Sequence, residues 1–311
     1  MYRNSLPLIG LAALTLSACS NGAETETAAT EAAATDTAAA PAATATETAA
    51  PATTGVASLD AAIAGEWRGD RSERDGFRNP AETITFFEID PSSTVLEIWP
   101  GGGWYADILA PWIAGNGGTY VAAHFPADAA SEGRRGSRER FEQRYADTAL
   151  YGDIVMAGFD DTTEALAEPG SIDTILTFRN VHNWMMGNYA EKAFADFYAA
   201  LREGGTLGVV EHRLPSTREQ SSNGGSGYVQ QAYVIRLAEE AGFELVGSSE
   251  VNANPADTAD HPFGVWTLPP VRRSAGRGEE PAEDFDRAFY DAIGESDRMT
   301  LLFRKPEGAS E

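Results

Sequence analysis

Runs of apolar residues alternate with amphipathic stretches along most of the chain. The apolar runs have the length and near-continuous apolar character of buried strands, and seven stand out, at 94–99, 119–125, 153–158, 172–178, 206–211, 243–251 and 298–304. Between them, apolar residues recur at helical spacing at 104–113, 137–148, 188–201 and 228–241. This order predicts an α/β fold, in which helices cover both faces of a doubly wound, mostly parallel seven-stranded sheet.

Two further helices are predicted ahead of the first strand. Ser58 can cap a short helix that runs through Trp67. Asn79 is placed to cap a second helix, with Pro80 at its first position. Glu82 then occupies the third position, from which its side chain can reach back to the cap amide.

A long connection separates the last two strands. Residues 252–297 are rich in Pro, Gly and acidic residues and contain one helix-like stretch at 283–293. Within this insert, the segment 254–278 can be a lid over a binding site or a surface loop, and the sequence leaves both interpretations open.

The first 19 residues resemble an export signal. One positive charge, Arg3, precedes an apolar run that is too short to span a membrane. The run ends in Leu16-Ser17-Ala18-Cys19, which resembles the lipobox of bacterial lipoproteins, where the cysteine is lipidated. The alternative is an ordinary cleaved signal with a chance cysteine. Because Cys19 is the only cysteine, no internal disulfide can form. We expect a lipid-anchored protein of the bacterial cell envelope, at the outer membrane and facing the periplasm.

Residues 20–57 have the composition of a tether. The part from 23 to 54 is almost wholly Ala, Thr, Glu and Pro, without an aromatic residue. Such a segment has nothing to bury and is expected to be disordered, while its Thr and Pro content argues against a long Ala-rich helix. The folded domain is therefore expected at 58–311.

The charge of the chain limits its partners. Net charge is −24, and because the first 57 residues contribute −4, the remainder carries −20. This balance argues against binding to nucleic acid or to anionic lipid surfaces. We expect contact with a membrane only through the lipid anchor.

The stretch around residue 100 carries the candidate chemistry. Val95-Leu96-Glu97-Ile98 ends a predicted buried strand, and Gly101-Gly102-Gly103 follows just before a predicted helix. Glycines let a loop approach a ligand closely, and an acid at the end of a buried strand is costly unless it has a role. Over about 79–305 the chain resembles class I S-adenosylmethionine-dependent methyltransferases, above all a little-characterised group of predicted bacterial ones.

The resemblance implies a Rossmann-like fold with an antiparallel last strand, S-adenosylmethionine as cofactor, and a methyl acceptor that is a small molecule or of unknown kind. In the family the strand acid lies near the ammonium end of the cofactor, an acid after the third strand faces the adenine, and an acid ends the second strand; here His124 stands at that last position. Trp99 replaces the first glycine of the motif, where its ring either crowds the site or points into the sheet. The expected cofactor-binding residues are Glu97, Gly101, Gly102, Gly103, Tyr105, His124 and Asp160.

The segment after the fourth strand faces the methyl acceptor in the family, which makes Asn180 and His182 the expected catalytic residues. His182 can act as a general base, since the ordinary pKa of histidine lies near neutrality. All four histidines are predicted near the carboxyl edge of the sheet, where α/β folds bind ligands. A metal shell of His182, Glu211, His212 and His261 is a weak alternative without a close ligand pair, and no metal is expected.

Two other functions stay open. Gly101-x-Gly103-x-x-Ala106 also fits the dinucleotide fingerprint of NAD(P)-dependent oxidoreductases, although that pattern is weak alone. Export of the chain, Trp99 in the motif and the missing ribose acid favour instead a non-catalytic ligand-binding lipoprotein on a methyltransferase fold.

Overall fold

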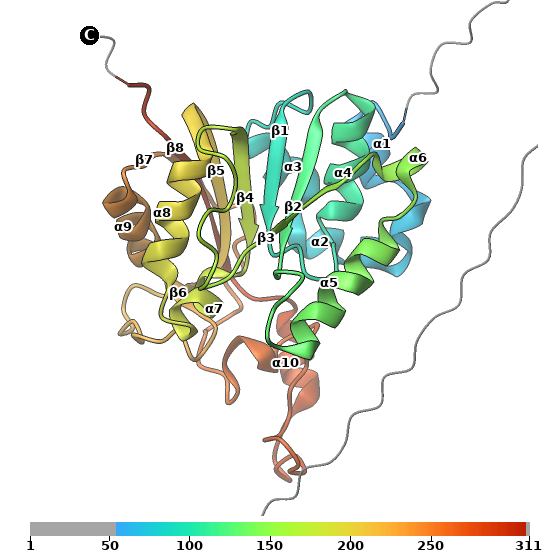
Figure 1. The fold of residues 1–311 in the computed structure, drawn as a ribbon. Coiled ribbons are helices and arrows are strands. Elements are labelled where there is room, and N and C mark those ends of the chain that lie inside the picture. The colour runs from blue at the N-terminus through green and yellow to red at the C-terminus, as the bar shows by residue number, and fades with distance from the viewer. Residues whose placement is uncertain (1–53, 309–311) are drawn as a thin grey trace, which may run out of the picture. The chain divides into compact units, whose positions relative to one another are not determined.

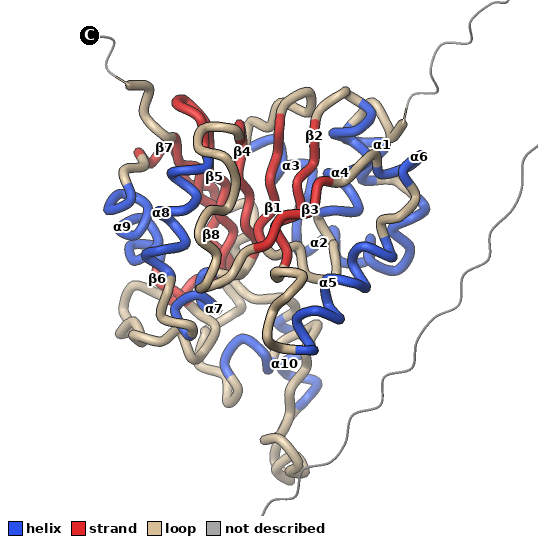
Figure 2. The backbone as a smooth tube through the Cα atoms, in the orientation of Figure 1, coloured by secondary structure: helices blue, strands red, loops and turns tan. Residues whose placement is uncertain are grey.

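A mixed sheet forms the centre of the computed structural model, which describes residues 54–308 (Figures 1 and 2). Its strand order is β3-β2-β1-β4-β5-β8-β7, and the short β6 pairs with β5 off this path. The strands are β1 Thr94–Ile98, β2 Thr119–His124, β3 Val155–Gly158, β4 Ile172–Phe178, β5 Leu201–Leu214, β6 Val229–Gln230, β7 Glu244–Ser249 and β8 Arg298–Arg304. The two pairings of β8, with β5 and with β7, are antiparallel and the other strand pairs are parallel, so the predicted fold class is confirmed.

Helices cover both faces of the sheet (Figure 1). Their bounds are α1 Leu59–Ile63, α2 Asp75–Arg78, α3 Pro80–Phe86, α4 Ala106–Gly115, α5 Glu132–Arg144, α6 Thr148–Tyr151, α7 Val181–Met186, α8 Ala190–Ala200, α9 Gln231–Ala241 and α10 Arg287–Ile293, with 3-10 helices η1 Glu66–Arg74 and η2 Gly264–Thr267. Neighbouring strand residues point to opposite faces, so Val95 joins the core under α3 and α4 and Leu96 joins the core under α8 and α9.

The order of the strands reverses between β1 and β4, because the chain builds outward from β1 to β3 and then returns to place β4 on the other side. Ligands of open α/β sheets bind at the carboxyl ends of the strands at such a reversal. The insert between β7 and β8, with α10, gathers at this same edge, in the lower part of Figure 1.

The N-terminal helix starts are confirmed in part. Ser58 caps α1 by accepting a hydrogen bond from the amide of Ala61 at 3.1 Å. Asn79 precedes α3 with Pro80 first in the helix, but the side-chain cap is wrong. The backbone of Asn79 is left-handed (φ 41°), and its side chain donates instead to the carbonyl of Val251 at 2.6 Å.

Helix α4 runs through Pro111, which the sequence left as a possible stop or kink. A proline in a helix deprives the carbonyl four residues earlier of its donor. Here that carbonyl belongs to Asp107, and the indole N–H of Trp67 donates to it at 2.8 Å. The neighbouring 3-10 helix thus replaces the lost backbone hydrogen bond.

Several element bounds differ from the prediction. Helix α5 begins at Glu132, five residues before the expected start, because Ser131 caps it by accepting from the amide of Arg134. Helix α7 was not predicted at all, and β5 extends beyond 206–211 at both ends. The predicted export signal with Cys19 and the predicted tether, as far as residue 53, lie outside the described residues. Between residues 54 and 308 we find no helix with the length and apolar character to cross a bilayer.

Candidate functional site

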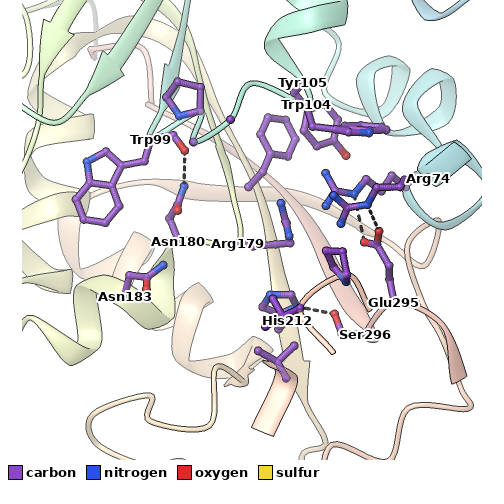
Figure 3. Close-up of a pocket in the computed structure, with 18 of the residues that line it drawn as sticks. Arg74, Trp99, Trp104, Tyr105, Arg179, Asn180, Asn183, His212, Glu295 and Ser296 are labelled. Atoms are coloured by element: carbon purple, nitrogen blue, oxygen red, sulfur yellow. Dashed lines mark hydrogen bonds and ion pairs between the residues drawn. The ribbon is translucent and has the colours of Figure 1, made fainter. Parts of the chain in front are cut away.

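A cavity of about 430 Å³ opens at the carboxyl edge of the sheet (Figure 3). Its walls come from the loop after β1, the ends of β4 and β5, the helices before α3, and the insert, including Trp266 and Pro269. Of the predicted cofactor and catalytic residues, the cavity is lined by Glu97, Gly101, Gly102, Tyr105, Asn180 and His182. Sequence reasoning missed a second part of the site, which consists of arginines. The cavity is also lined by Arg71, Arg74, Arg78 and Arg179.

The glycine loop turns sharply between β1 and α4. Trp99, Gly101 and Gly103 all have positive φ, at 47°, 58° and 83°. Glycine adopts this conformation without strain, whereas a bulky residue does so rarely. A Cβ atom at Gly103 would also overlap the hydroxyl of Tyr145, so Gly103 serves the packing of the loop and does not line the cavity.

Glu97 offers an acid without a cationic hydrogen-bond partner in the part of the chain that the structure describes. Its side chain is only 2% exposed, and its one hydrogen bond comes from the hydroxyl of Tyr120 at 2.5 Å. Burial raises the pKa of Glu97 to about 8, although the Tyr120 hydrogen bond opposes the shift. A cation that enters the cavity beside Glu97 would favour its ionised form.

Asp107, a residue that sequence reasoning missed, anchors the loop from below. Its fully buried carboxylate binds Arg71 at 2.9 Å and Arg144 at 3.0 Å, and accepts from the hydroxyl of Tyr145 at 2.7 Å. The signal for it was an acid in the first turn of the helix after the glycines, where the helix dipole favours negative charge.

The indole of Trp99 lies on the other side of the loop from the arginines (Figure 3). It packs 4.7 Å from Phe125, 6.1 Å from Phe159 and 6.2 Å from Trp184, measured between ring centroids. Its N–H donates to the carbonyl of Phe159 at 2.8 Å. The ring therefore fills the space between the carboxyl ends of β2 and β3 and the start of α7. The sequence had left open the direction in which the Trp99 ring points, and this packing determines it.

His124 and Asp160, expected at the nucleoside half of the cofactor, do not line the cavity. The Nδ1 atom of His124 accepts from the amide of Phe125, and burial lowers the pKa of this histidine to about 4. Asp160 accepts hydrogen bonds from Thr162 inside its own loop. Burial alone would raise the pKa of Asp160, but the Thr162 hydrogen bonds and the charge of Arg134 outweigh burial, so the pKa is lowered. Both residues flank the aromatic rings that Trp99 contacts.

Asn180 joins two strand ends. Its amide nitrogen donates to the carbonyl of Ile98 at 3.0 Å and lies 3.4 Å from that of Trp99 and 3.3 Å from the hydroxyl of Thr177 (Figure 3). The residue thus fixes the loop after β1 to the end of β4. These contacts give it a positioning role.

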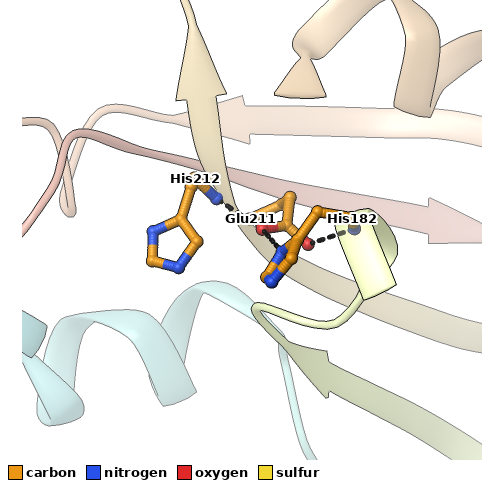
Figure 4. Close-up of side chains that lie close together, drawn as sticks. All are labelled: His182, Glu211 and His212. Atoms are coloured by element: carbon orange, nitrogen blue, oxygen red, sulfur yellow. Dashed lines mark hydrogen bonds and ion pairs between the residues drawn. The ribbon is translucent and has the colours of Figure 1, made fainter. Parts of the chain in front are cut away.

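His182 stands in the first turn of α7 and contacts Glu211 at the end of β5 (Figure 4). Its Nδ1 lies 3.0 Å from one carboxylate oxygen, which also accepts from the amide of His212 at 2.8 Å. A carboxylate only accepts, so Nδ1 carries the proton and Nε2 keeps a free lone pair. The dyad thereby presents a basic nitrogen on a ring that lines the cavity.

The four predicted histidines divide into three environments. His182 and His212 line the cavity, while His124 is buried behind the loop. His261 contacts Asp257 at 2.8 Å in a separate cluster. Of the alternative metal set, His182, Glu211 and His212 have ligand atoms within 4.8 Å of one another, and His261 stands apart.

No family model and no curated protein matches this chain. Solved structures do match. A protein assigned as a sarcosine dimethylglycine methyltransferase from Galdieria sulphuraria gives a TM-score of 0.51 at 14% identity, over 76% of this chain and 86% of the other. The [4+2]-cyclase SpnF gives 0.51 at 13% identity, over 82% and 98%. An S-adenosylmethionine-dependent methyltransferase from Aquifex aeolicus gives 0.46 at 14% identity, over 58% and 87%.

At such identities the likeness concerns the fold alone. The chain has the fold of class I S-adenosylmethionine-dependent methyltransferases. One of the matched proteins is named for a cyclisation, so the fold does not by itself determine the reaction.

Proposed function

We propose that the protein transfers a methyl group from S-adenosylmethionine to an acceptor bound in the cavity. The observation that carries this proposal is Glu97, a buried acid without a cationic hydrogen-bond partner among residues 54–308, which opens on the same cavity as Gly101 and Gly102. S-adenosylmethionine supplies a methyl group on a positively charged sulfonium. Glu97 would hold the ammonium of its amino-acid half, and Gly101 and Gly102 would let it lie against the loop backbone.

The nucleoside half of the site has unused polar atoms around Trp99. Among the described residues, His124 Nε2, Trp184 Nε1 and Tyr189 Oη are buried without a hydrogen-bond partner. A nucleoside with its ring nitrogens and hydroxyls would satisfy such atoms. In the conformation described, the indole of Trp99 fills the space among them, so we infer that it moves aside for the cofactor.

The acceptor side has a base. His182 can take a proton at Nε2 from a hydroxyl, amine or thiol, and Glu211 stabilises the imidazolium that results. The Val265–Trp266 part of the insert, placed beside His182 with a ring-centroid distance of 6.1 Å to Trp266, covers the same region and excludes water. The segment 254–278, which the sequence left as a lid or a surface loop, thus contributes to the wall of the site.

Trp99 also favours a second candidate function. If its indole stays in place, the nucleoside half is permanently filled, and the chain is a ligand-binding protein on a methyltransferase fold. This candidate predicts no affinity for S-adenosylmethionine or S-adenosylhomocysteine, whereas methyl transfer predicts both.

Calorimetric titration of S-adenosylhomocysteine into the purified full-length chain at pH 8.5 distinguishes them. Methyl transfer predicts saturable binding, weakened roughly 10- to 100-fold in Glu97→Gln, since a hydrogen bond to a charged group contributes about 1.5–3 kcal/mol. Glu240→Gln, which makes the same change at an exposed ion pair with Arg236, serves as the matched control. Equal affinity in Glu97→Gln would contradict the assigned role, and absent binding in the wild type would favour the second candidate. Titration of NADH, followed by its fluorescence, tests the oxidoreductase alternative in the same preparation.

We further propose that the chain is exported and lipid-anchored through Cys19, on the evidence of its N-terminal sequence alone. Metabolic labelling with radioactive palmitate should mark the wild type and spare Cys19→Ser. Equal labelling of the two, or none of either, would contradict the anchor.

A further inference from the structure

Four arginines gather on one side of the cavity, and we call them the arginine wall: Arg74, Arg78, Arg179 and Arg298. They come from four different elements, namely η1, α2, the turn after β4, and the start of β8. The first three line the cavity and Arg298 is buried behind them. In a chain of net charge −24, this concentration of positive charge at one cavity needs a cause.

One carboxylate serves most of the wall. Glu295 binds Arg74 at 2.5 Å (Figure 3). It also binds Arg78 and Arg298, each at 3.2 Å. For the side chain of Arg179 we find no hydrogen bond or ion pair within residues 54–308, although its backbone is held at φ 62° by a hydrogen bond to Val210. Within the described residues, three of the four guanidinium groups therefore share one carboxylate, and the fourth has none.

Several guanidinium nitrogens have no hydrogen-bond partner among the described residues, although the Arg78 guanidinium lies over the Trp104 ring, 4.6 Å from its centroid. They are Nη1 and Nη2 of Arg78, whose residue is 1% exposed, and Nη2 of Arg74. Buried charged donors without acceptors are costly, and folded proteins rarely leave them so. Burial, followed by repulsion from Arg179, lowers the pKa of Arg78 to about 9. The wall thus lacks negative charge.

The other arginine cluster at this loop has enough acceptors for its guanidinium groups. Arg71 and Arg144 share Asp107, each within 3.0 Å, and both are about one-third exposed, so water solvates their remaining donors. His212 adds no positive charge to the wall, because burial and neighbouring charges hold its pKa well below its usual value. The difference between the clusters points to a ligand that completes the wall.

We propose that the arginine wall binds a carboxylate or phosphate group of the methyl acceptor. As to the identity of the ligand, this inference rests on the proposed function. Guanidinium groups bind such planar or tetrahedral oxyanions through paired N–H donors, which Arg78 offers with both of its terminal nitrogens. His182 lines the same cavity, so an acceptor held by its anionic group presents a nucleophile elsewhere in the molecule to the base.

The same chemistry has a second source, because the amino-acid half of S-adenosylmethionine also ends in a carboxylate. An acceptor site and a cofactor-carboxylate site differ in one measurable respect. An anion at the acceptor site binds together with S-adenosylhomocysteine, whereas an anion at the cofactor-carboxylate site competes with it.

The test is calorimetric titration of inorganic phosphate into the full-length chain, alone and after saturation with S-adenosylhomocysteine. We expect saturable phosphate binding whose affinity stays within about threefold when S-adenosylhomocysteine is present. Arg78→Gln and Arg179→Gln should each weaken it at least tenfold. Arg202→Gln, at an exposed ion pair with Asp173, is the control and should leave it unchanged. Because Arg179 has no side-chain partner in the described structure, its variant keeps the test valid if Arg78→Gln fails to fold.

The outcomes distinguish a failure of the anion site from a failure of the proposed methyl transfer. Phosphate binding that S-adenosylhomocysteine abolishes would overturn the acceptor assignment and give the wall to the cofactor. Binding of S-adenosylhomocysteine without any phosphate binding would overturn the anion site and leave methyl transfer standing. Phosphate binding without S-adenosylhomocysteine binding would overturn methyl transfer and the acceptor identity, while the wall remains an anion site. Equal phosphate affinity in Arg78→Gln, Arg179→Gln and the wild type would also overturn the proposal.

Discussion

The two sides of the glycine loop differ in charge and in packing, although both hold buried polar atoms without a hydrogen-bond partner in the described structure. On one side, Trp99 and its aromatic neighbours form a close-packed apolar cluster in which the indole N–H already has an acceptor. On the other side, the arginine wall faces an open cavity with donors that lack acceptors. Both sides depend on the same few residues after β1. The contrast teaches that a glycine motif locates a site, whereas the side chains around the motif decide which half of it is open.

This contrast also assigns different roles to the two acids beside the loop. Asp107 is saturated by two arginines and a tyrosine, and therefore holds the loop in place. Glu97 has one neutral hydrogen-bond partner in the described structure, and its carboxyl group can therefore form an ion pair with a cationic ligand. Five experiments disturb this arrangement, from the largest expected effect to the smallest.

Removal of the shared anchor should have the largest effect. Asp107→Ala leaves a tyrosine hydroxyl and two arginines without their buried acceptor, and should lower the free energy of unfolding by about 3 kcal/mol. Urea denaturation followed by circular dichroism measures it. Glu240→Ala removes an exposed i,i+4 ion pair and, as the control, should change stability by less than about 0.5 kcal/mol. Similar losses in the two variants would contradict the role of Asp107 as anchor.

Truncation of the ring should have the next largest effect. Trp99→Gly deletes a partly buried indole and should cost about 2–3 kcal/mol of stability, less than usual for a large aromatic residue because glycine relieves the strain of φ 47°. Thermal or urea unfolding provides the value. Trp266→Ala, which removes a ring that lines the cavity beside His182, is the comparison. A rise in stability in Trp99→Gly would mean that the aromatic cluster is not a packed part of the fold.

The affinity for S-adenosylmethionine should rise with pH. The pKa of Glu97 is raised to about 8, so the acid is mostly neutral at pH 6 and ionised at pH 9. A cationic ligand favours the ionised form, so affinity should increase up to tenfold per unit below pH 8 and level off above it. Calorimetry at a series of pH values tests this, with Glu97→Gln as the control that flattens the profile.

The same shift gives a sign for stability without ligand. Because the unfolded acid titrates near its usual pKa of 4.5 and the folded one near 8, the unfolded state binds fewer protons between these values. Stability should therefore fall as pH rises from about 4.5 to about 8. An unchanged slope in Glu97→Gln would show that another group is responsible.

The smallest effect is expected from Tyr120→Phe. The Tyr120 hydroxyl favours the ionised form of Glu97, so its loss should raise the pKa of Glu97 further and shift the binding profile to higher pH. Stability should fall by about 1 kcal/mol, the usual contribution of one hydrogen bond. A shift of the profile to lower pH would contradict the direction of this interaction.

The sequence predicted the fold well because its strands are continuous apolar runs with clear limits. Residues 172–178 and 298–304 match β4 and β8 at both ends. The errors fall where a local signal competes with distant contacts. Asn79 has every local feature of a capping residue, yet its side chain bonds to Val251, which is remote in sequence. Helix α7 is short, and the amide of His182, its second residue, donates to Glu211 of the distant strand β5, so no local pattern indicates the helix.

The site was predicted in the part that belongs to one continuous segment. Glu97 and its glycines follow one another, and the structure places Glu97, Gly101 and Gly102 at the cavity. The arginine wall is assembled from four elements, so its members look like ordinary charged residues in the sequence. The orientation of Trp99 likewise depends on Phe125, Phe159 and Trp184, which lie on three other segments.

The most direct test of the account is the affinity for S-adenosylhomocysteine of the wild type and of Trp99→Gly, measured side by side by calorimetry. If the indole holds the place of the nucleoside half, the wild type binds and Trp99→Gly binds at least tenfold more tightly. If neither binds while both remain folded, the loop does not hold this cofactor, and the chain is a ligand-binding protein on a methyltransferase fold.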